Sequence, residues 1–321
     1  MILQPLLQVC DLVVRFDETP GTFAAVGGVN FSIGVGQTYC LVGESGCGKS
    51  LTARAVLRLV PPPGVPSGRI LFQGEDLLTL PEERMRRVRG NRIGMIFQEP
   101  MTALNPVLRV GMQAAEPLRL HRGMDAAQAR ERVLKLFGQV GIPAPEARYN
   151  DYPHQLSGGM RQRVMIAMAL TCGPELLLAD EPTTALDVTI QGQILHLIRS
   201  LSEQHGMGVL LITHDLGVVA QTADFVSVMY AGRIVESAPV ADIFAKPLHP
   251  YTQGLMHSAP TRQNMLQKQL PAIAGSVPHP GAMPSGCLFH PRCPHVMLRC
   301  RETYPYTVGG EHTVACWLHA R

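Results

Sequence analysis

The chain has 321 residues, and its 46% hydrophobic and 17% charged residues are typical of a folded protein large enough for two domains. The formal net charge is only +3 and the Lys and Arg residues are scattered, which argues against a nucleic-acid binder, because such proteins concentrate positive charge. A single tryptophan and 5% aromatic residues likewise argue against a base-stacking surface.

The N-terminal segment, residues 1–16, is predicted to form a strand and not a secretion signal, since no basic residue precedes its apolar residues and Asp11 comes early. The uncharged segment 19–43 is interrupted by proline and glycine, unlike a membrane-spanning helix. We therefore expect the chain in the cytosol unless partners hold it at a membrane.

Short apolar runs separated by Gly, Pro and Asp predict strands in the first 75 residues. These runs are residues 12–16, 29–33, 39–42 and 70–72. A helix is predicted for residues 51–60, because three prolines at 61–63 stop it. Residues 82–89 predict a short basic helix on the surface, and residues 93–97 a buried strand.

A helical period of apolar residues runs from 110 to 141, with Asp125 as an N-cap within it. One face of this segment carries Val133, Leu136, Phe137 and Val140. The pattern predicts an all-helical insertion.

Strands and helices are predicted to alternate beyond this insertion. The expected elements are a helix at 159–171, a strand at 176–179, a helix at 188–204, and strands at 208–213, 225–230 and 233–236. Such alternation predicts a mainly parallel sheet covered by helices.

Residues 43–50 read GESGCGKS, which is the G-x-x-x-x-G-K-S pattern of a phosphate-binding loop. The loop follows a predicted strand and opens a predicted helix, as this pattern requires. Its predicted nucleotide-binding residues are Gly43, Glu44, Ser45, Gly46, Cys47, Gly48, Lys49, Ser50 and Leu51. Lys49 is expected to reach the β- and γ-phosphates, and Ser50 to offer a hydroxyl oxygen to Mg²⁺.

Cys47 lies among the loop's N–H groups and beside the helix N-terminus, which should favour a thiolate. It is therefore a candidate reactive thiol. The equal alternative is that cysteine serves there only as a small residue.

Two more motifs follow in order, LSGGMRQR at 156–163 and LLLADE at 176–181. Together with the phosphate loop they resemble the ATPase cassette of ABC transporters, over roughly residues 10–240. The resemblance implies an α/β fold with a mainly parallel sheet, an antiparallel β subdomain, and a helical subdomain at about residues 100–160. It also implies that ATP and Mg²⁺ bind.

The resemblance assigns roles to residues outside the phosphate loop. Gln98 matches the glutamine loop that senses Mg²⁺ and touches the membrane subunit, Asp187 matches a loop at the dimer interface, and His214 matches the switch histidine. The family's aromatic adenine platform corresponds to either Phe16 or Phe23.

Phosphoryl transfer to water needs neutralised γ-phosphate charge, a metal that bridges the β- and γ-oxygens, and a group that orients the attacking water. Lys49 matches the first need, Ser50 with Asp180 the second, and Glu181 the third. On this interpretation Lys49, Gln98, Glu181 and His214 are catalytic, and Ser50, Gln98 and Asp180 contact Mg²⁺.

A second anion site is predicted at Ser157, Gly158 and Gly159, because these residues begin a helix and offer N–H groups and a hydroxyl. In the family this site faces the partner cassette. The chain therefore holds two half-sites and must dimerise to hydrolyse ATP, with a paralogous ATPase subunit as the expected partner.

Residues 249–255 (HPYTQGL) and 286–294 (GCLFHPRCP) resemble the C-terminal extension of dipeptide and oligopeptide importer ATPases, a group that includes some nickel importers. The resemblance implies an energy-coupling ATPase that works with two transmembrane permease subunits and, indirectly, an extracytoplasmic peptide-binding protein. It implies a peripheral location at the cytoplasmic face of the inner membrane. The predicted boundary divides residues 1–240, the ATPase domain, from residues 241–321, a small Cys-rich domain.

Four cysteines cluster in this C-terminal region with 5, 6 and 15 residues between them. They are Cys287, Cys293, Cys300 and Cys316. Four thiolates suit either a [4Fe-4S] cluster or zinc, and the spacing fits neither ferredoxin nor zinc-knuckle patterns. We favour the iron-sulfur cluster. The neighbouring His290, His295, His312 and His319 keep a mixed Cys/His zinc site open, and a reducing cytosol makes disulfides the weakest option.

Two other functions compete with transport. A soluble ABC ATPase acting on DNA or the ribosome should carry long heptad arms or two cassettes, and the sequence has neither. A metal-sensing ATPase would have a degenerate nucleotide site, whereas every ATPase role here has a competent residue. Peptide length, and nickel or haem in place of peptide, stay open.

Overall fold

A computed structural model describes residues 4–18, 21–99, 103–183, 188–258 and 273–320. The chain forms two compact units. Unit 1 comprises residues 1–32, 39–78 and 213–321, and unit 2 comprises residues 33–38 and 79–212. Among the described residues, no helix has both the length and the apolar character that crossing a membrane requires.

Unit 1 combines two runs of hydrogen-bonded strands with helices. Its elements are β1 (Leu7–Glu18), β2 (Gly21–Ile33), β3 (Thr38–Val42), α1 (Lys49–Val56), β4 (Val65–Phe72), β5 (Glu75–Asp76), α9 (Leu216–Thr222), β9 (Phe225–Tyr230), β10 (Arg233–Pro239), α10 (Val240–Ala245), α11 (Pro250–Ser258), η3 (Pro280–Ala282), η4 (His290–Arg292), α12 (Leu298–Glu302), β11 (Val308–Gly309) and β12 (Thr313–Val314). The bounds of β2 and β3 reach one residue into unit 2.

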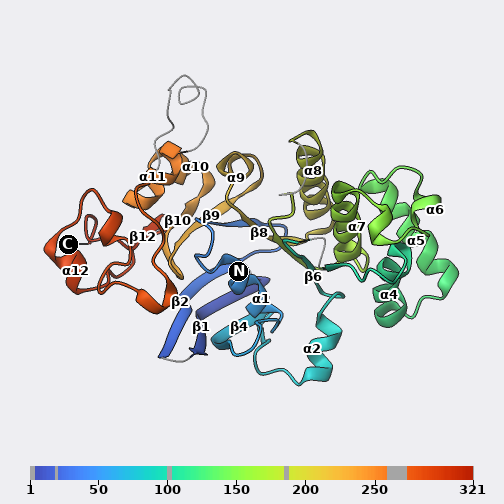
Figure 1. Ribbon diagram of the computed structural model, residues 1–321, viewed down its shortest axis with the longest axis horizontal. Coiled ribbons are helices and arrows are strands. Elements are labelled where there is room, and N and C mark those ends of the chain that lie inside the picture. The colour runs from blue at the N-terminus through green and yellow to red at the C-terminus, as the bar shows by residue number, and fades with distance from the viewer. Residues whose placement is uncertain (1–3, 19–20, 100–102, 184–187, 259–272, 321) are drawn as a thin grey trace. The chain divides into compact units, whose positions relative to one another are not determined.

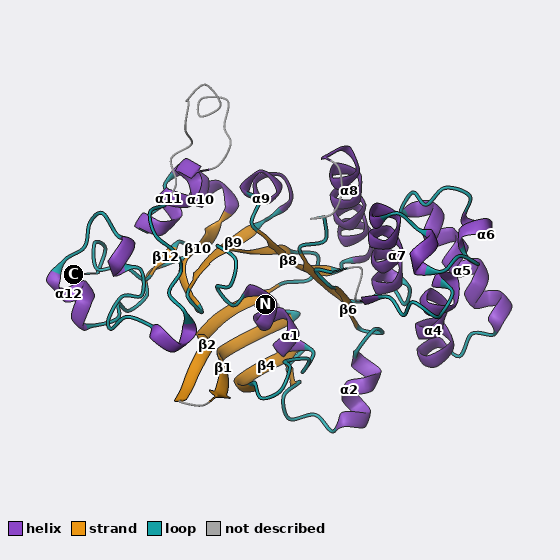
Figure 2. Ribbon diagram, viewed as in Figure 1, coloured by secondary structure: helices purple, strands orange, loops and turns teal. Residues whose placement is uncertain are grey.

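The strands of unit 1 form an antiparallel sheet and a mixed one. The antiparallel sheet has the order β2-β1-β4-β5. Strands β2, β1 and β4 lie side by side in Figure 2. In the mixed run β3 pairs in parallel with β9, and β9, β10, β12 and β11 continue with antiparallel pairing. All five residues of β3 are buried, as expected for a strand covered on both faces.

Strand β1 lies largely within the segment 1–16 that was predicted as a strand, and it passes through a bulge at Asp11. Asp11 has a left-handed φ of 49°, and the register with β4 shifts between Cys10 and Val13. Asn30 closes the bulge: the Asp11 N–H donates to its side-chain oxygen at 2.8 Å, and its amide donates to the Asp11 carboxylate at 2.9 Å.

Unit 2 contains three parallel strands and the helical insertion. Its elements are α2 (Glu82–Val88), β6 (Ile93–Ile96), α4 (Val110–Arg122), α5 (Ala126–Gln139), α6 (Pro145–Arg148), η1 (Pro153–Gln155), α7 (Gly158–Leu170), β7 (Leu176–Asp180), α8 (Val188–His205) and β8 (Gly208–Thr213). Strand β7 pairs in parallel with both β6 and β8. Every residue of these three strands is buried, which explains their continuous apolar runs.

Helices α4 to α7 pack together as the green part of the ribbon in Figure 1. Helix α5 begins as predicted, because the Asp125 carboxylate accepts hydrogen bonds of 2.9 Å from the N–H groups of Ala127 and Gln128. The predicted apolar face of Val133, Leu136, Phe137 and Val140 is buried. The helical character of this segment is thus confirmed.

One buried carboxylate on β10 anchors the segments of unit 1 that follow this strand. Glu236 is 1% exposed. It accepts hydrogen bonds from the N–H groups of Leu248 (2.7 Å) and His249 (2.9 Å) and from Nε2 of His312 (2.8 Å). Residues 241–321, predicted as a small separate domain, are accordingly grouped with unit 1.

Candidate functional site

The phosphate loop curls between β3 and the start of α1, where glycine is sterically required. Gly48 caps α1 with a φ of 101° and no side-chain hydrogen bond. A Cβ there would approach the carbonyl oxygen of Ala25 to 2.8 Å, and a Cβ at Gly43 would overlap the Met229 carbonyl. Gly48 offers no side-chain acceptor to the first N–H groups of α1, and the positive end of this helix favours an anion.

Lys49 lies inside the curl of the loop and is 5% exposed. Its ammonium group donates to the carbonyl oxygens of Gly43 at 2.8 Å and Glu44 at 2.9 Å. The loop backbone thus holds the positive charge beside the helix N-terminus. Ser45 and Gly46 lie exposed at the tip of the same loop.

Cys47 is buried at 1% exposure, and this burial raises the pKa of its thiol above the ordinary value. The charge of Lys49, whose Nζ lies 3.7 Å from the Cys47 sulfur, lowers this pKa by less than burial raises it. The predicted reactive thiolate is therefore wrong. Cys47 is instead a small residue buried in the loop, and its sulfur would lie only 2.9 Å from a Cβ on Gly43.

Phe16 and Phe23, the two candidates for the adenine platform, stack on each other. Their ring centroids are 5.7 Å apart and the rings are inclined by 16°. Both rings are half-buried. The two candidates for the adenine platform thus form one aromatic pair, Phe16 with Phe23.

His214 lies exposed directly after β8, in unit 1. The next residue, Asp215, caps α9, because its carboxylate accepts hydrogen bonds from the N–H groups of Gly217 (2.8 Å) and Val218 (3.3 Å). This cap fixes the backbone beside His214.

The remaining predicted nucleotide residues belong to unit 2. Ser157 and Gly158 are exposed, and the Ser157 hydroxyl accepts a hydrogen bond of 3.3 Å from Met160 N–H as the cap of α7. Gly159 is half-buried in the first turn of this helix, and Gln98 is exposed after β6. Asp187 lies outside the described residues.

Asp180 and Glu181 follow each other at the end of β7. Asp180 is fully buried. Glu181 has a left-handed φ of 48°, and its N–H donates to the Ile212 carbonyl at 2.9 Å. Such a conformation is strained for a residue other than glycine and occurs preferentially at functional positions.

Gln162, which the sequence interpretation did not single out, connects two of these motifs within unit 2. It is buried in α7, and its amide donates to the Pro182 carbonyl at 2.6 Å. The signature helix thereby fixes the backbone next to Glu181. Its place inside LSGGMRQR was the available signal.

The sequence interpretation also did not single out Tyr251 and Arg292, although Tyr251 lies in the motif at 249–255 and Arg292 in the motif at 286–294. The Arg292 guanidinium pairs with the Glu44 carboxylate at 2.6 and 2.9 Å. The Glu44 N–H donates to the Tyr251 hydroxyl at 2.9 Å. The C-terminal region of unit 1 thus contacts the phosphate loop directly.

The four C-terminal cysteines are free thiols; Cys300 and Cys316 are buried, and Cys287 and Cys293 are half-buried. Burial, with smaller effects of the other three thiols, raises the pKa of Cys287 to about 11. Burial also raises the pKa of Cys316, with smaller effects of Cys293 and Cys300. Cys287 packs against the cluster that contains Cys300, and its N–H donates to the Cys300 carbonyl at 2.8 Å.

A single zinc ion is not supported by this arrangement. Within the described residues, no three His, Cys, Asp or Glu side chains lie close enough to hold one metal ion. His290, His312 and His319 are instead within hydrogen-bonding distance of Cys287 O (3.0 Å), Glu236 (2.8 Å) and Leu248 O (3.1 Å).

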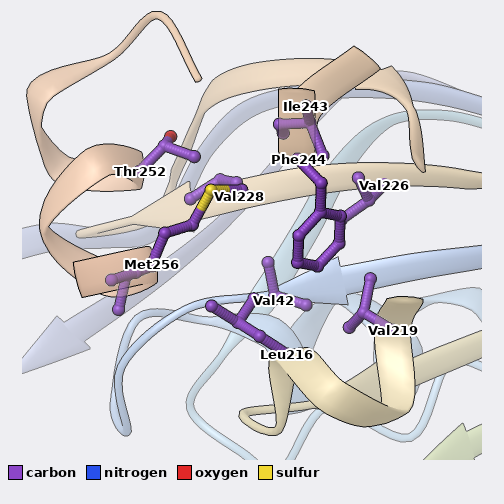
Figure 3. Close-up of a pocket in the computed structure, with 10 residues that line it drawn as sticks. Val42, Leu216, Val219, Val226, Val228, Ile243, Phe244, Thr252 and Met256 are labelled. Atoms are coloured by element: carbon purple, nitrogen blue, oxygen red, sulfur yellow. The ribbon is translucent and has the colours of Figure 1, made fainter. Parts of the chain in front are cut away.

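A small cavity in unit 1 lies among β3, β9, α9, α10 and α11. Figure 3 shows the side chains of Val42, Val226, Phe244 and Met256 around it. Its volume is about 10 Å³, which holds one water at most. It is a packing gap and not a ligand site.

Comparisons with known proteins place these features in context. The family described as "ABC transporter" matches residues 26–184, and "Oligopeptide/dipeptide transporter, C-terminal region" matches residues 235–300. The dipeptide transport ATP-binding protein DppD of Bacillus subtilis is 51% identical over 98% of this chain and 95% of its own length. The oligopeptide transport ATP-binding protein AppD of the same organism is 49% identical over 99% of this chain and 98% of its own.

A solved structure with the same fold is the ATP-binding cassette MJ0796, in a dimeric post-hydrolysis state bound to ADP and Pi. It superimposes with a TM-score of 0.67 at 28% identity, covering 73% of this chain and 98% of that one.

Proposed function

Because the chain belongs to the family of ABC transporter ATP-binding proteins, we propose that it is the ATP-hydrolysing subunit of an importer for dipeptides or oligopeptides. The observation that supports this proposal most directly is the match of residues 235–300 to the oligopeptide/dipeptide transporter C-terminal region. Full-length similarity to DppD and AppD supports the same substrate class.

The phosphate loop is proposed to bind the phosphates of ATP. The N–H groups at the start of α1 and the ammonium of Lys49 supply the positive potential that a polyphosphate needs. The residues proposed to line this half of the site are Gly43, Glu44, Ser45, Gly46, Cys47, Gly48, Lys49, Ser50 and Leu51. Phe16 and Phe23 are proposed as the adenine platform.

Mg²⁺ fits the oxygen donors that the motifs provide. The hydroxyl of Ser50, the carboxylate of Asp180 and the side-chain oxygen of Gln98 are hard ligands, and Mg²⁺ typically takes only one or two from protein. When bound, this ion would neutralise charge on the β- and γ-phosphates. Glu181 is proposed to orient the attacking water, and His214 to hydrogen-bond the γ-phosphate.

Assembly with other chains is part of the proposal. The exposed helix start at Ser157, Gly158 and Gly159, with Asp187, is proposed to face the nucleotide of a paralogous ATPase subunit. Gln98 is proposed to transmit the closure of this heterodimer to two transmembrane permease subunits. The complex would lie at the cytoplasmic face of the inner membrane and receive peptide from an extracytoplasmic binding protein.

The four C-terminal thiols are proposed to hold a [4Fe-4S] cluster. The proposal rests on the number and type of the donors, since four cysteine thiolates are the usual ligand set of a [4Fe-4S] cluster. Anaerobically purified protein should be brown, absorb near 400 nm and contain about four irons per chain. Colourless protein that contains one zinc and no iron would contradict the cluster and indicate a zinc site.

The functional proposal is tested by isolating the native complex and identifying its chains by mass spectrometry. We expect a second ATPase chain and two permease chains at equal stoichiometry. Recovery of this chain alone, or with ribosomes or DNA-repair proteins, would contradict a role in transport.

A further inference from the structure

Glu44, the second residue of the phosphate loop, is held at three points. Its carbonyl oxygen accepts a hydrogen bond from the Lys49 ammonium at 2.9 Å. Its N–H donates to the Tyr251 hydroxyl at 2.9 Å, and its carboxylate is paired with both terminal nitrogens of Arg292. Two of the three contacts come from the C-terminal region.

Arg292 is itself rigidly mounted. Its side chain is 5% exposed. The guanidinium donates to the carbonyl oxygens of Ala274 (2.8 Å), Gly275 (3.3 Å) and Ile273 (3.4 Å), and it lies 5.7 Å from the ring centroid of Tyr230. A guanidinium fixed on so many sides is preorganised to receive a carboxylate in fork geometry.

An aromatic cluster supports both contacts. Tyr230 packs edge-on against Tyr251 at 4.7 Å and against Phe289 at 5.1 Å between ring centroids. Phe289 lies two residues after Cys287, and Arg292 directly precedes Cys293. The Arg292 contact to Glu44 is therefore built into the segment that joins two of the four cysteines.

We propose that Arg292, assisted by Tyr251, is a positioning residue for the phosphate loop, so that the C-terminal region sets the affinity for ATP. This inference rests on the proposed assignment of residues 43–50 as the ATP phosphate site. It adds to that assignment a structural reason for the C-terminal region to influence nucleotide binding.

The physical basis is charge and geometry together. A carboxylate in a loop that must bind a polyphosphate opposes binding unless its charge is neutralised, and Arg292 neutralises it. The same ion pair fixes the Glu44 backbone, whose carbonyl orients Lys49. Loss of the guanidinium should therefore leave both an uncompensated negative charge and a displaced Lys49.

The test is MgATP binding and steady-state hydrolysis by full-length protein with its partners. We expect Arg292→Ala to weaken ATP binding about tenfold or more and to raise KM more than it lowers kcat. Arg292→Lys keeps the charge but not the fork, so it should recover part of the affinity. Tyr251→Phe, which removes one hydrogen-bond acceptor, should have a smaller effect in the same direction.

A double variant separates positioning from general stability. If Arg292 acts through Glu44, the variant Glu44→Ala/Arg292→Ala should bind ATP as Glu44→Ala alone does. Arg299→Ala is the matched control, since this exposed arginine lies over the Trp317 ring, 3.5 Å from its centroid, and belongs to the same region. Thermal unfolding of every variant reports on folding.

Three results would overturn the inference: unchanged ATP affinity in Arg292→Ala, additive effects in the double variant, or an equal loss in Arg299→Ala. Lys49→Ala distinguishes the two levels of the argument. If Lys49→Ala weakens binding and Arg292→Ala does not, only the positioning role fails. If Lys49→Ala leaves ATP binding intact, the phosphate-site assignment fails with it.

Discussion

Replacing Glu236 by glutamine should loosen the attachment of the C-terminal region to β10. The carboxylate accepts three hydrogen bonds while it is 1% exposed. Its Oε1 receives those from Leu248 N–H and His312, and its Oε2 receives the one from His249 N–H. A glutamine amide has one oxygen, so one of these positions must become an NH₂ group that faces a donor.

The magnitude follows from the less costly orientation of the amide. Placing NH₂ at the Oε2 position leaves only His249 N–H without an acceptor, which costs about 1–3 kcal/mol for a buried donor. The unfolding temperature should fall by ~2–4 °C for each kcal/mol. Glu236→Ala removes all three acceptors and should cost more.

Differential scanning calorimetry measures this effect, and hydrogen exchange at residues 248 and 249 locates it. Glu83→Gln is the control, because Glu83 is 80% exposed and forms only an i,i+4 pair with Arg87. This exposed pair should contribute about 0–0.5 kcal/mol. An unfolding temperature of Glu236→Gln equal to wild type, or an equal fall in Glu83→Gln, would refute the reasoning.

Three further predictions concern single side chains. The variant Glu181→Gln should bind ATP but hydrolyse it at less than about a tenth of the wild-type rate, because a water-orienting group contributes ~10²-fold or more. Lys49→Ala should instead weaken ATP binding itself, and single-turnover kinetics separate the two effects. Cys47 should resist alkylation near neutral pH in folded protein and react after unfolding, as followed by mass spectrometry, since burial raises its pKa; rapid native labelling would contradict this. Burial, with a smaller effect of His319, lowers the pKa of His249 to about 3. Between pH 6.5 and 3 this histidine is therefore protonated in the unfolded chain and neutral in the folded chain. Stability should therefore fall as pH drops from about 6.5 towards 3, by up to ~1.4 kcal/mol per pH unit, and His249→Asn should flatten this dependence in urea titrations.

The sequence predicted those elements whose pattern is set by local interactions. Asp125 caps α5 through N–H groups two and three residues away, so composition and spacing sufficed to locate it. Residues 176–179 of β7 read as an unbroken apolar run because every residue of the strand is buried. By contrast, the bulge of β1 at Asp11 was not predicted, because it depends on Asn30, 19 residues away.

The site was predictable where a motif is contiguous and not where distant segments meet. The phosphate loop was identified from eight consecutive residues, but the contact of Arg292 with Glu44 joins residues 248 positions apart. The Cys47 prediction failed for a related reason. Helix position and Lys49 favour the thiolate, but the burial that outweighs them comes from the folded structure.

ATP-driven peptide accumulation is the most direct test of the central claim. Proteoliposomes containing the purified complex, with MgATP on the cytoplasmic side and binding protein with labelled dipeptide or oligopeptide on the other, should accumulate peptide. Complex carrying Glu181→Gln should not. Hydrolysis of ATP without peptide accumulation, or accumulation of Ni²⁺ in its place, would contradict the assignment of this chain to peptide import.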